Sequence, residues 1–491
     1  MDSRLFLAFD LGAESGRTFL GRLSEGRIRT RELTRFPNAP TYFLGHQHWN
    51  VYGLFEEIKK GMEAGSAEAG KPLESLAVDT WGVDFGLLAG DGTILRLPYA
   101  YRDGRTEGAM EGFFKRMPRE DVYERTGIQF LPFNSLFQLF ATARDNPALL
   151  KRAETLLFMP DLFTFLLTGE KASEFTIAST SQILNLRIRT WDEAILSALG
   201  LSSRIMPDVL APGTMVGTLL PSVSVETGLQ EIPVIATASH DTGAAVAAIP
   251  ASGEDWAYIS SGTWSLMGVE LPSPLITPQT LAANFTNEGG VAGTIRFLKN
   301  IAGLWLLQQC RKEWSKSMDL SYDELTRMAA EAAPLKVFVD PDCPDFLNPP
   351  SMSEAIRNFC LRTGQVPPPS PAETVRCILE SLALKYRYTL DQVRLLTAKE
   401  VKRIHVIGGG SRNELLCRFT ADATHLTVLA GPAEATATGN IMVQALALGY
   451  VKTLSEIRAI VRNSVNVRAY QPTGWADWDS AYERFRDVTG L

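Results

Sequence analysis

The chain has 491 residues, 45% of them hydrophobic, and this length exceeds what one hydrophobic core supports, so we expect two domains of roughly 200 residues or more. Lys and Arg number 48 against 55 Asp and Glu, and the net charge of −7 without a long basic run argues against a nucleic-acid partner. Five cysteines and five histidines form no CxxC pair or metal-ligand cluster, which excludes a disulfide scaffold and structural zinc. No apolar stretch approaches the ~18 residues of a membrane span, so we expect a cytoplasmic protein without a membrane partner.

The first feature along the chain is a strand over Phe6–Phe9 that meets a Gly/Ser turn and returns as a second strand. Small residues in the turn let backbone N–H groups approach phosphate oxygens, and the Ser15 hydroxyl adds a donor. Asp10 beside such a turn offers the carboxylate that a Mg²⁺ ion needs, and Arg17 would neutralise a phosphate. The same pattern also fits an ordinary hairpin, in which Asp10 is a turn residue and Arg17 pairs with Glu14 at the surface.

Helices and strands alternate over the segments that follow, as is typical of an α/β domain. The apolar positions of residues 51–62 follow helical spacing, with Asn50 as the candidate N-cap. A buried strand at residues 76–78 runs into the motif at residues 79–85, which contains Gly82.

A second buried strand, at residues 232–237, ends at the motif Ser239-His240-Asp241-Thr242, and a short helix over residues 243–248 follows it. Asp241 is either the N-cap of that helix or a carboxylate that the helix N-terminus keeps ionised and oriented toward a reacting hydroxyl. The second interpretation suits phosphoryl transfer, because the hydroxyl loses its proton late and positioning matters more than basicity. The segment 250–253 is predicted to be a hinge between the domains.

A second hairpin follows the predicted hinge and repeats the pattern of the first one. An apolar strand at residues 256–259 meets a turn that carries the hydroxyls of Ser261 and Thr263. Two facing turns of this kind would hold one triphosphate between them. The alternative is again a pair of ordinary hairpins, since glycine turns are common.

The C-terminal half is predicted to contain two amphipathic helices, at residues 300–314 and 374–396. A strand at residues 403–407 runs into Gly408-Gly409-Gly410, and a capping-box pattern at residues 411–414 predicts that a helix follows. The three glycines fit neither the GxGxxG dinucleotide fingerprint nor a Walker motif. They form either a platform for an adenosine ring or a plain tight turn between strand and helix.

Taken together, these motifs resemble those of the FGGY carbohydrate kinases, and the resemblance covers nearly the whole chain. It implies an α/β fold of two ribonuclease-H-like domains of the actin and sugar-kinase superfold with an interdomain active-site cleft. The N-terminal sugar-binding domain would occupy residues 1–248 and the C-terminal nucleotide-binding domain residues 249–491. The motifs that carry the resemblance are Asp10-Leu11-Gly12 with Ser15 and Arg17, and residues 79–85, 101–103, 127–134, 239–242, 260–268, 286–290 and 408–410.

The resemblance also implies roles for single residues. Asp241 would be the catalytic base that accepts the proton of the substrate hydroxyl. Many relatives carry Thr where this chain has Ala13, and Glu14 adds a negative charge, so the phosphate contacts at this turn depart from the family pattern. The sugar would contact Gly82, His240, Asp241, Thr242 and Asn300, and ATP would contact Ala13, Glu14, Ser15, Gly16, Arg17, Thr263, Gln308 and Gly410.

A further implication of the resemblance concerns Cys360 and Cys377, whose spacing is similar to that of relatives and allows a bridge. In a reducing cytoplasm we nevertheless expect both to remain thiols.

The activity that the resemblance implies is ATP- and Mg²⁺-dependent transfer of the γ-phosphoryl group to the 1-hydroxyl of L-rhamnulose, by a monomer or homodimer whose partners are a ketose and ATP. Another ketose, such as L-fuculose or a xylulose, is the alternative substrate. From other functional classes, the same fold serves nucleotide-driven conformational machines and sugar-sensing regulators. A regulator should carry a helix-turn-helix arm, and none is evident in the sequence.

Overall fold

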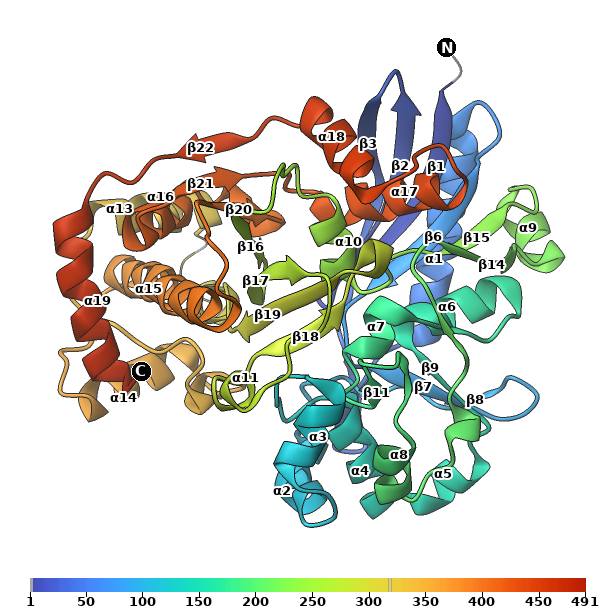
Figure 1. Ribbon diagram of the computed structural model, residues 1–491, viewed down its shortest axis with the longest axis horizontal. Coiled ribbons are helices and arrows are strands. Elements are labelled where there is room, and N and C mark those ends of the chain that lie inside the picture. The colour runs from blue at the N-terminus through green and yellow to red at the C-terminus, as the bar shows by residue number, and fades with distance from the viewer. Residues whose placement is uncertain (1–2, 317, 319) are drawn as a thin grey trace. The chain divides into compact units, whose positions relative to one another are not determined.

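The computed structural model describes residues 3–316, 318 and 320–491 (Figure 1). By its contacts the chain forms two compact units. The first unit contains the residues up to Ser252 together with Glu270–Phe297 and Ala435–Ser464, and the second contains Gly253–Val269, Leu298–Glu434 and Val465–Leu491. The chain first passes from the first unit to the second between Ser252 and Gly253, within the segment 250–253 that was predicted to be a hinge. The later half of the chain then returns to the first unit twice, which its order in the sequence does not reveal.

A six-stranded sheet with the order β14-β15-β6-β1-β2-β3 forms the centre of the first unit. Strand β1 pairs antiparallel with β2 and parallel with β6, and β15 pairs parallel with β6. The strands predicted at residues 6–9, 76–78 and 232–237 are therefore confirmed. Bounds of the sheet strands are β1 (Arg4–Leu11), β2 (Ser15–Ser24), β3 (Arg27–Pro37), β6 (Ser75–Thr80), β14 (Thr214–Thr218) and β15 (Pro233–Ala236).

Helix α1 (Val51–Ala69) begins where the sequence predicts, because the Asn50 side chain accepts a hydrogen bond from the Gly53 backbone N–H at 3.1 Å. Helix α17 (Ala435–Ala447) comes from late in the chain and lies beside β1 and β2 (Figure 1). It packs so closely on α10 (Asp241–Ala247) that a Cβ on Gly439 would stand 1.8 Å from the Ala244 carbonyl oxygen, and only glycine fits there.

A second part of the first unit packs around an aromatic core, to which Phe113, Phe158 and Phe137 of α4 (Ser135–Asp145) contribute. The remaining elements are β4 (Thr41–Phe43), β5 (His46–His48), β7 (Phe85–Leu88), β8 (Ile94–Arg96), α2 (Ala109–Phe114), α3 (Arg119–Thr126), α5 (Pro147–Arg152), β9 (Thr155–Phe158), α6 (Met159–Thr168), β10 (Ser173–Glu174), α7 (Phe175–Ser179), β11 (Leu184–Asn185), β12 (Thr190–Trp191), α8 (Glu193–Leu199), β13 (Val209–Leu210), α9 (Pro221–Thr227), α11 (Pro278–Ala282), β18 (Thr286–Gly289) and α18 (Leu454–Ser464).

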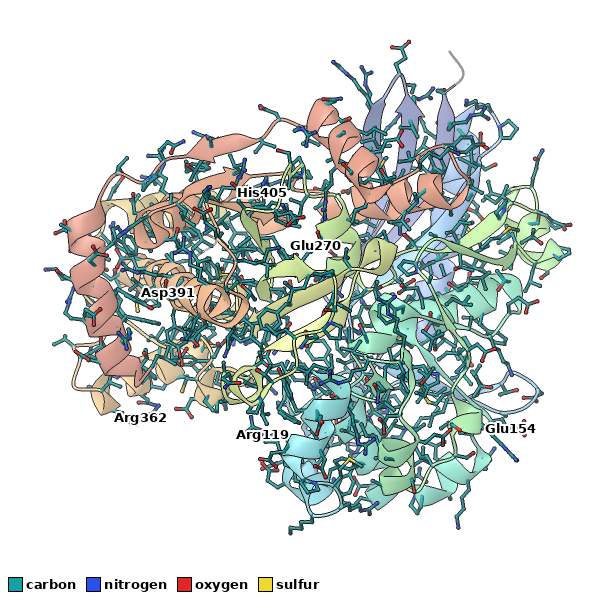
Figure 2. All side chains as sticks on the ribbon, in the orientation of Figure 1. Arg119, Glu154, Glu270, Arg362, Asp391 and His405 are labelled. Carbon is teal, nitrogen blue, oxygen red and sulfur yellow. The ribbon has the colours of Figure 1, made fainter. Side chains whose placement is uncertain are left out.

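The second unit contains strands in the order β19-β17-β16-β20-β21-β22, with β16 antiparallel to β17 and parallel to β20. His405 packs edge-on against Trp256. Asp391 accepts a hydrogen bond from Tyr482 at 3.0 Å. Figure 2 labels His405 and Asp391. Bounds are β16 (Trp256–Ser261), β17 (Ser265–Leu271), β19 (Ile295–Ile301), α12 (Trp305–Trp314), α13 (Tyr322–Glu331), α14 (Met352–Arg362), α15 (Pro371–Thr397), β20 (Arg403–Ile407), α16 (Glu414–Thr424), β21 (Thr427–Ala430), β22 (Arg468–Tyr470) and α19 (Trp475–Thr489).

Two local predictions for this unit need correction. The helix predicted from residue 300 begins only at Trp305, because Asn300 lies in β19 and the Leu304 and Trp305 N–H groups bond to Gly262 and Thr263. The helix after the three glycines is capped by Asn413, whose side chain accepts from Leu416 N–H at 3.0 Å, and not by a capping box from Ser411. Among the described residues, no helix combines the length and apolar composition needed to cross a bilayer.

Candidate active site

Three carboxylates of the first unit lie close enough to influence one another. Asp10 and Asp79 are register partners on the parallel strands β1 and β6, and Asp241 begins α10. Burial, together with the negative charges of Asp10 and Asp241, raises the pKa of Asp79 well above its usual range. Its Oδ2 accepts a hydrogen bond from Asn440 Nδ2 at 2.6 Å. Asp79 is therefore a buried carboxyl, near Asp10 and Asp241, that favours its protonated form.

Asp241 is oriented by its neighbour and reaches solvent. Its Oδ1 accepts hydrogen bonds from the Thr242 backbone N–H at 2.5 Å and the Thr242 hydroxyl at 3.2 Å, and its side chain is 29% exposed. The N-cap position of α10 belongs to His240, so the interpretation of Asp241 as the N-cap is wrong. The arrangement presents an oriented carboxylate oxygen, as a general base needs.

The turn between β1 and β2 has the tight geometry that the sequence predicts. The Gly12 N–H donates to the Ser15 carbonyl at 3.0 Å, and the Asn38 side-chain amide donates to the Gly12 carbonyl at 2.8 Å. Arg17 pairs with Asp10 at 2.5 Å, which places its guanidinium beside the carboxylate at the end of β1. The Ala13 to Arg17 segment is thus anchored at both ends.

The carboxylate of Asp10 fits a Mg²⁺ ion only in part. Within the described part of the chain, no group of three or more His, Cys, Asp or Glu side chains is arranged to hold a metal. Mg²⁺ is commonly bound by one or two carboxylates together with phosphate oxygens and water. Asp10, with Asp79 and Asp241 nearby, suits an ion that arrives on a nucleotide better than a permanently bound one.

In the second unit, the turn between β16 and β17 meets the three glycines. The Gly262 N–H donates to the Trp264 carbonyl at 2.8 Å, which confirms a second tight hairpin. A Cβ on Gly410 would lie 2.0 Å from Ser261 Oγ, so glycine alone lets the loop after β20 approach this hairpin. Gln308, in the first turns of α12, has a buried Oε1 without a hydrogen-bond partner among the described residues. Thr263 and Gly410 thus lie on adjoining turns.

Two of the residues predicted to contact sugar, Gly82 and His240, lie side by side in the first unit. A Cβ on Gly82 would stand 3.4 Å from His240 Nε2, so the glycine leaves this edge of the imidazole uncovered. Asp84 holds the turn that contains Gly82. Its Oδ2 accepts hydrogen bonds from the indole N–H groups of Trp49 and Trp81 at 2.6 and 2.9 Å. Burial raises the pKa of Asp84 to about 6.

Sequence reasoning missed Glu174 and Thr176, which hold the loop that carries Asp241. Glu174 Oε2 accepts from the Ser239 N–H at 3.1 Å and from the Thr176 hydroxyl at 2.5 Å, while that hydroxyl accepts from the His240 N–H at 3.1 Å. Burial raises the pKa of Glu174 to about 7. The segment around Glu174 is rich in Ser and Thr, so its local sequence gave no signal that this carboxyl is buried.

Sequence reasoning also missed Arg296, a fully buried residue beside Glu288 and His240. One guanidinium nitrogen lies 3.1 Å from Glu288 Oε2 and the other terminal nitrogen 3.1 Å from His240 Nδ1. The side chains of Arg296, Glu288 and His240 therefore form one cluster.

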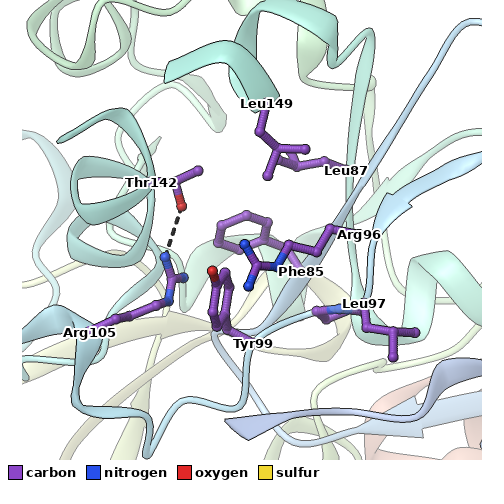
Figure 3. A pocket seen from close by; sticks show the side chains of 9 residues that line it. Phe85, Leu87, Arg96, Leu97, Tyr99, Arg105, Thr142 and Leu149 are labelled. Carbon is purple, nitrogen blue, oxygen red and sulfur yellow. Dashed lines mark hydrogen bonds between the residues drawn. The ribbon is translucent and has the colours of Figure 1, made fainter. Parts of the chain in front are cut away.

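A separate cavity of about 20 Å³ lies near the side chain of Arg105, which donates to the Thr142 hydroxyl at 2.8 Å (Figure 3). This volume accommodates water-sized molecules and excludes a ketose or a nucleotide. None of the predicted site residues lines it. The cavity is lined by Phe85, Leu87, Arg96, Leu97, Pro98, Tyr99, Arg105, Thr142 and Leu149.

Cys360 and Cys377 are free and buried, as expected for thiols. Burial raises the pKa of Cys360 to about 11 and that of Cys377 well above its ordinary value. Both thiols are therefore neutral and unreactive in this structure.

Comparison with known proteins adds to this geometry. The chain is 48% identical to the Rhamnulokinase of Bacteroides thetaiotaomicron over 98% of this chain and 99% of the relative, and 42% identical to that of Pectobacterium atrosepticum over 98% and 96%. The solved xylulose kinase of Rhodospirillum rubrum shares the fold with a TM-score of 0.78 at 18% identity, over 99% of this chain and 98% of that one. Residues 5–248 match the N-terminal domain and residues 257–448 the C-terminal domain of the FGGY family of carbohydrate kinases. The chain belongs to the FGGY family of carbohydrate kinases.

Proposed function

We propose that this chain transfers the γ-phosphoryl group of ATP to the 1-hydroxyl of L-rhamnulose and releases L-rhamnulose 1-phosphate and ADP. The similarity to proteins named Rhamnulokinase, at 48% and 42% identity over 98% of this chain, supports the choice of substrate. The observation that carries the chemistry is the Asp241 carboxylate, held by two Thr242 donors and still open to solvent. Another ketose, such as L-fuculose or a xylulose, is the alternative acceptor.

In this proposal Asp241 accepts the proton of the 1-hydroxyl as its oxygen bonds to the γ-phosphorus and the bond to the ADP oxygen breaks. Hydrogen bonds from the Thr242 N–H and hydroxyl hold the carboxylate oxygen in one orientation, as proton acceptance requires. A weak base suffices, because the loose transition state draws the proton late. Gly82, His240, Thr242 and Asn300 are the proposed sugar contacts.

The proposed nucleotide contacts are backbone and small side chains of the two hairpin turns and the glycine loop. Asp10 would hold Mg²⁺ bound to the ATP phosphates, and that ion would neutralise charge on the transferring group. Arg17, already paired with Asp10, would lie beside it. Residues proposed to contact ATP are Ala13, Glu14, Ser15, Gly16, Arg17, Thr263, Gln308 and Gly410.

We further propose that residues 1–248 supply most of the sugar-binding domain and residues 249–491 most of the nucleotide-binding domain, while Glu270–Phe297 and Ala435–Ser464 pack within the first unit. The matched family segments support this assignment. Because the reaction consumes ATP, we place the protein in the cytoplasm, acting as a monomer or homodimer on a ketose and ATP.

The test is ADP release with a panel of ketoses, by wild type and Asp241→Asn. We expect the highest kcat/KM with L-rhamnulose, and a kcat about 10²–10⁴-fold lower for the variant at an unchanged melting temperature. A kcat within a few-fold of wild type would remove Asp241 from the mechanism. ADP release that does not depend on any sugar would instead favour a nucleotide-driven conformational machine.

A further inference from the structure

We propose that Arg296 is a positioning residue that fixes which ring nitrogen of His240 carries the proton, so that His240 offers the ketose a hydrogen-bond donor. The catalytic meaning of this inference rests on the proposed function. The tautomer itself is a property of the free protein and is tested without any substrate.

The first step of the argument concerns the donors of Arg296. This side chain is 0% exposed, and its Nε donates to the Gly289 carbonyl at 2.8 Å. A terminal nitrogen lies 3.1 Å from His240 Nδ1 within hydrogen-bond geometry. A guanidinium has five N–H donors and no acceptor, so Nδ1 must be the acceptor. The proton of a neutral His240 ring is then on Nε2.

The second step concerns the direction in which that proton points. Nε2 lies 3.4 Å from Asp241 Oδ1 and 3.4 Å from the place that a Cβ of Gly82 would occupy. The Nε2–H group is therefore presented to the edge that Gly82 leaves open, next to the carboxylate. A protonated Nε2 donates to a hydroxyl oxygen and cannot take its proton. The proton of the acceptor hydroxyl is thereby directed to Asp241.

The third step concerns the other group that faces Nδ1. A proton on Nδ1 would point at an N–H donor of Arg296, and two donors cannot form a hydrogen bond. The competing acceptor is Glu288, whose Oε2 lies 3.4 Å from Nδ1. That oxygen is 3.1 Å from another nitrogen of Arg296, which holds it as an ion pair. The carboxylate balances the charge of Arg296, and Nδ1 stays an acceptor.

The substitution Arg296→Gln removes this constraint. A glutamine amide carries both a carbonyl acceptor and an NH₂ donor, so it satisfies either tautomer of His240. Arg296→Lys keeps a donor but loses the fork that bonds Gly289, Glu288 and His240 together. The lysine variant should therefore lie between wild type and the glutamine variant.

The experiment is a long-range ¹H–¹⁵N spectrum of the full-length protein labelled at its five histidines, recorded at pH 8 without sugar or nucleotide. His240→Gln assigns the signals of His240. We expect wild type to show a bare Nδ1 and a protonated Nε2, and Arg296→Gln to show a mixture. Proton occupancy at Nδ1 in wild type, or an Arg296→Gln spectrum identical to wild type, would overturn the proposal.

The kinetic companion measurement uses the ketose that wild type prefers. We expect Arg296→Gln to raise the KM for that ketose about tenfold and to change the KM for ATP less than twofold. Arg458→Gln is the control, because Arg458 forms a largely buried ion pair with Glu270 in the same unit. Equal changes of the His240 signals in this control would also overturn the proposal. Because the spectrum needs no turnover, its result is independent of which sugar is phosphorylated.

Discussion

The two units shape their predicted ligand-binding turns by different means. In the first unit, buried polar side chains such as Glu174 and Asp84 hold the turns by hydrogen bonds to backbone and indole groups. In the second unit, the loop at Gly410 approaches the β16–β17 hairpin because no side chain separates them. The difference teaches which substitutions matter: the first unit is sensitive to the loss of a charge or hydrogen bond, and the second to added volume.

The largest expected effect concerns charge in the first unit, at Asp84. Its folded pKa of about 6 exceeds the value of about 4 for an unfolded aspartate, so the native state binds more protons between these pH values. The contribution of Asp84 to the free energy of unfolding is fully present below pH ~4. It falls by about 3 kcal/mol as the pH rises through ~6. Urea unfolding of wild type and Asp84→Asn at pH 4 to 7 should show this slope lost in the variant. Parallel curves would contradict the assignment.

The matching test of volume in the second unit is Gly410→Ala. Its Cβ would meet Ser261 Oγ at 2.0 Å, and we expect a loss of about 1–3 kcal/mol of stability with a KM for ATP raised at least severalfold. Gly409→Ala is the control, because a Cβ there has no heavy atom within 4 Å. Thermal unfolding and ADP-release kinetics measure both. Equal behaviour of the two variants would show that close approach is not what Gly410 provides.

The smallest expected effect comes from removing one hydroxyl group while the volume of the side chain stays nearly the same. Thr176→Val takes away the oxygen that links Glu174 to the His240 N–H. We expect kcat to fall about tenfold through misplacement of Asp241, with the KM for ATP unchanged. Thr420→Val, which loses only a bond to a carbonyl within α16, should keep full activity. A Thr176→Val enzyme with wild-type kcat would show that this link does not position the base.

Local chemistry allowed much of the fold to be predicted. The N-cap at Asn50, both hairpin turns and the short helix after His240 depend on neighbours within a few residues. The start of α12 was predicted wrongly because its first N–H groups bond to Gly262 and Thr263, about 40 residues earlier. A helical pattern in residues 300–304 does not reveal such partners.

The candidate site follows the same division. The motifs around Asp10, Gly82 and Asp241 were found because they are contiguous in the sequence. Glu174 and Arg296 were not, because their contacts with the Asp241 loop join residues 65 and 56 positions apart. A single buried glutamate or arginine has the same local appearance whether it supports a functional loop or only the core.

Helix α17 has a consequence for how the protein is made. Gln444 donates to the Leu7 carbonyl at 3.0 Å and accepts from Ser75 at 2.8 Å, and Asn440 bonds Asp79, so the central strands depend on residues from late in the chain. Buried polar groups left without such partners cost free energy. On the ribosome the first unit therefore stays incomplete until residues beyond 440 emerge. A fragment that ends near residue 248 would lack this support and is not an autonomous folding unit.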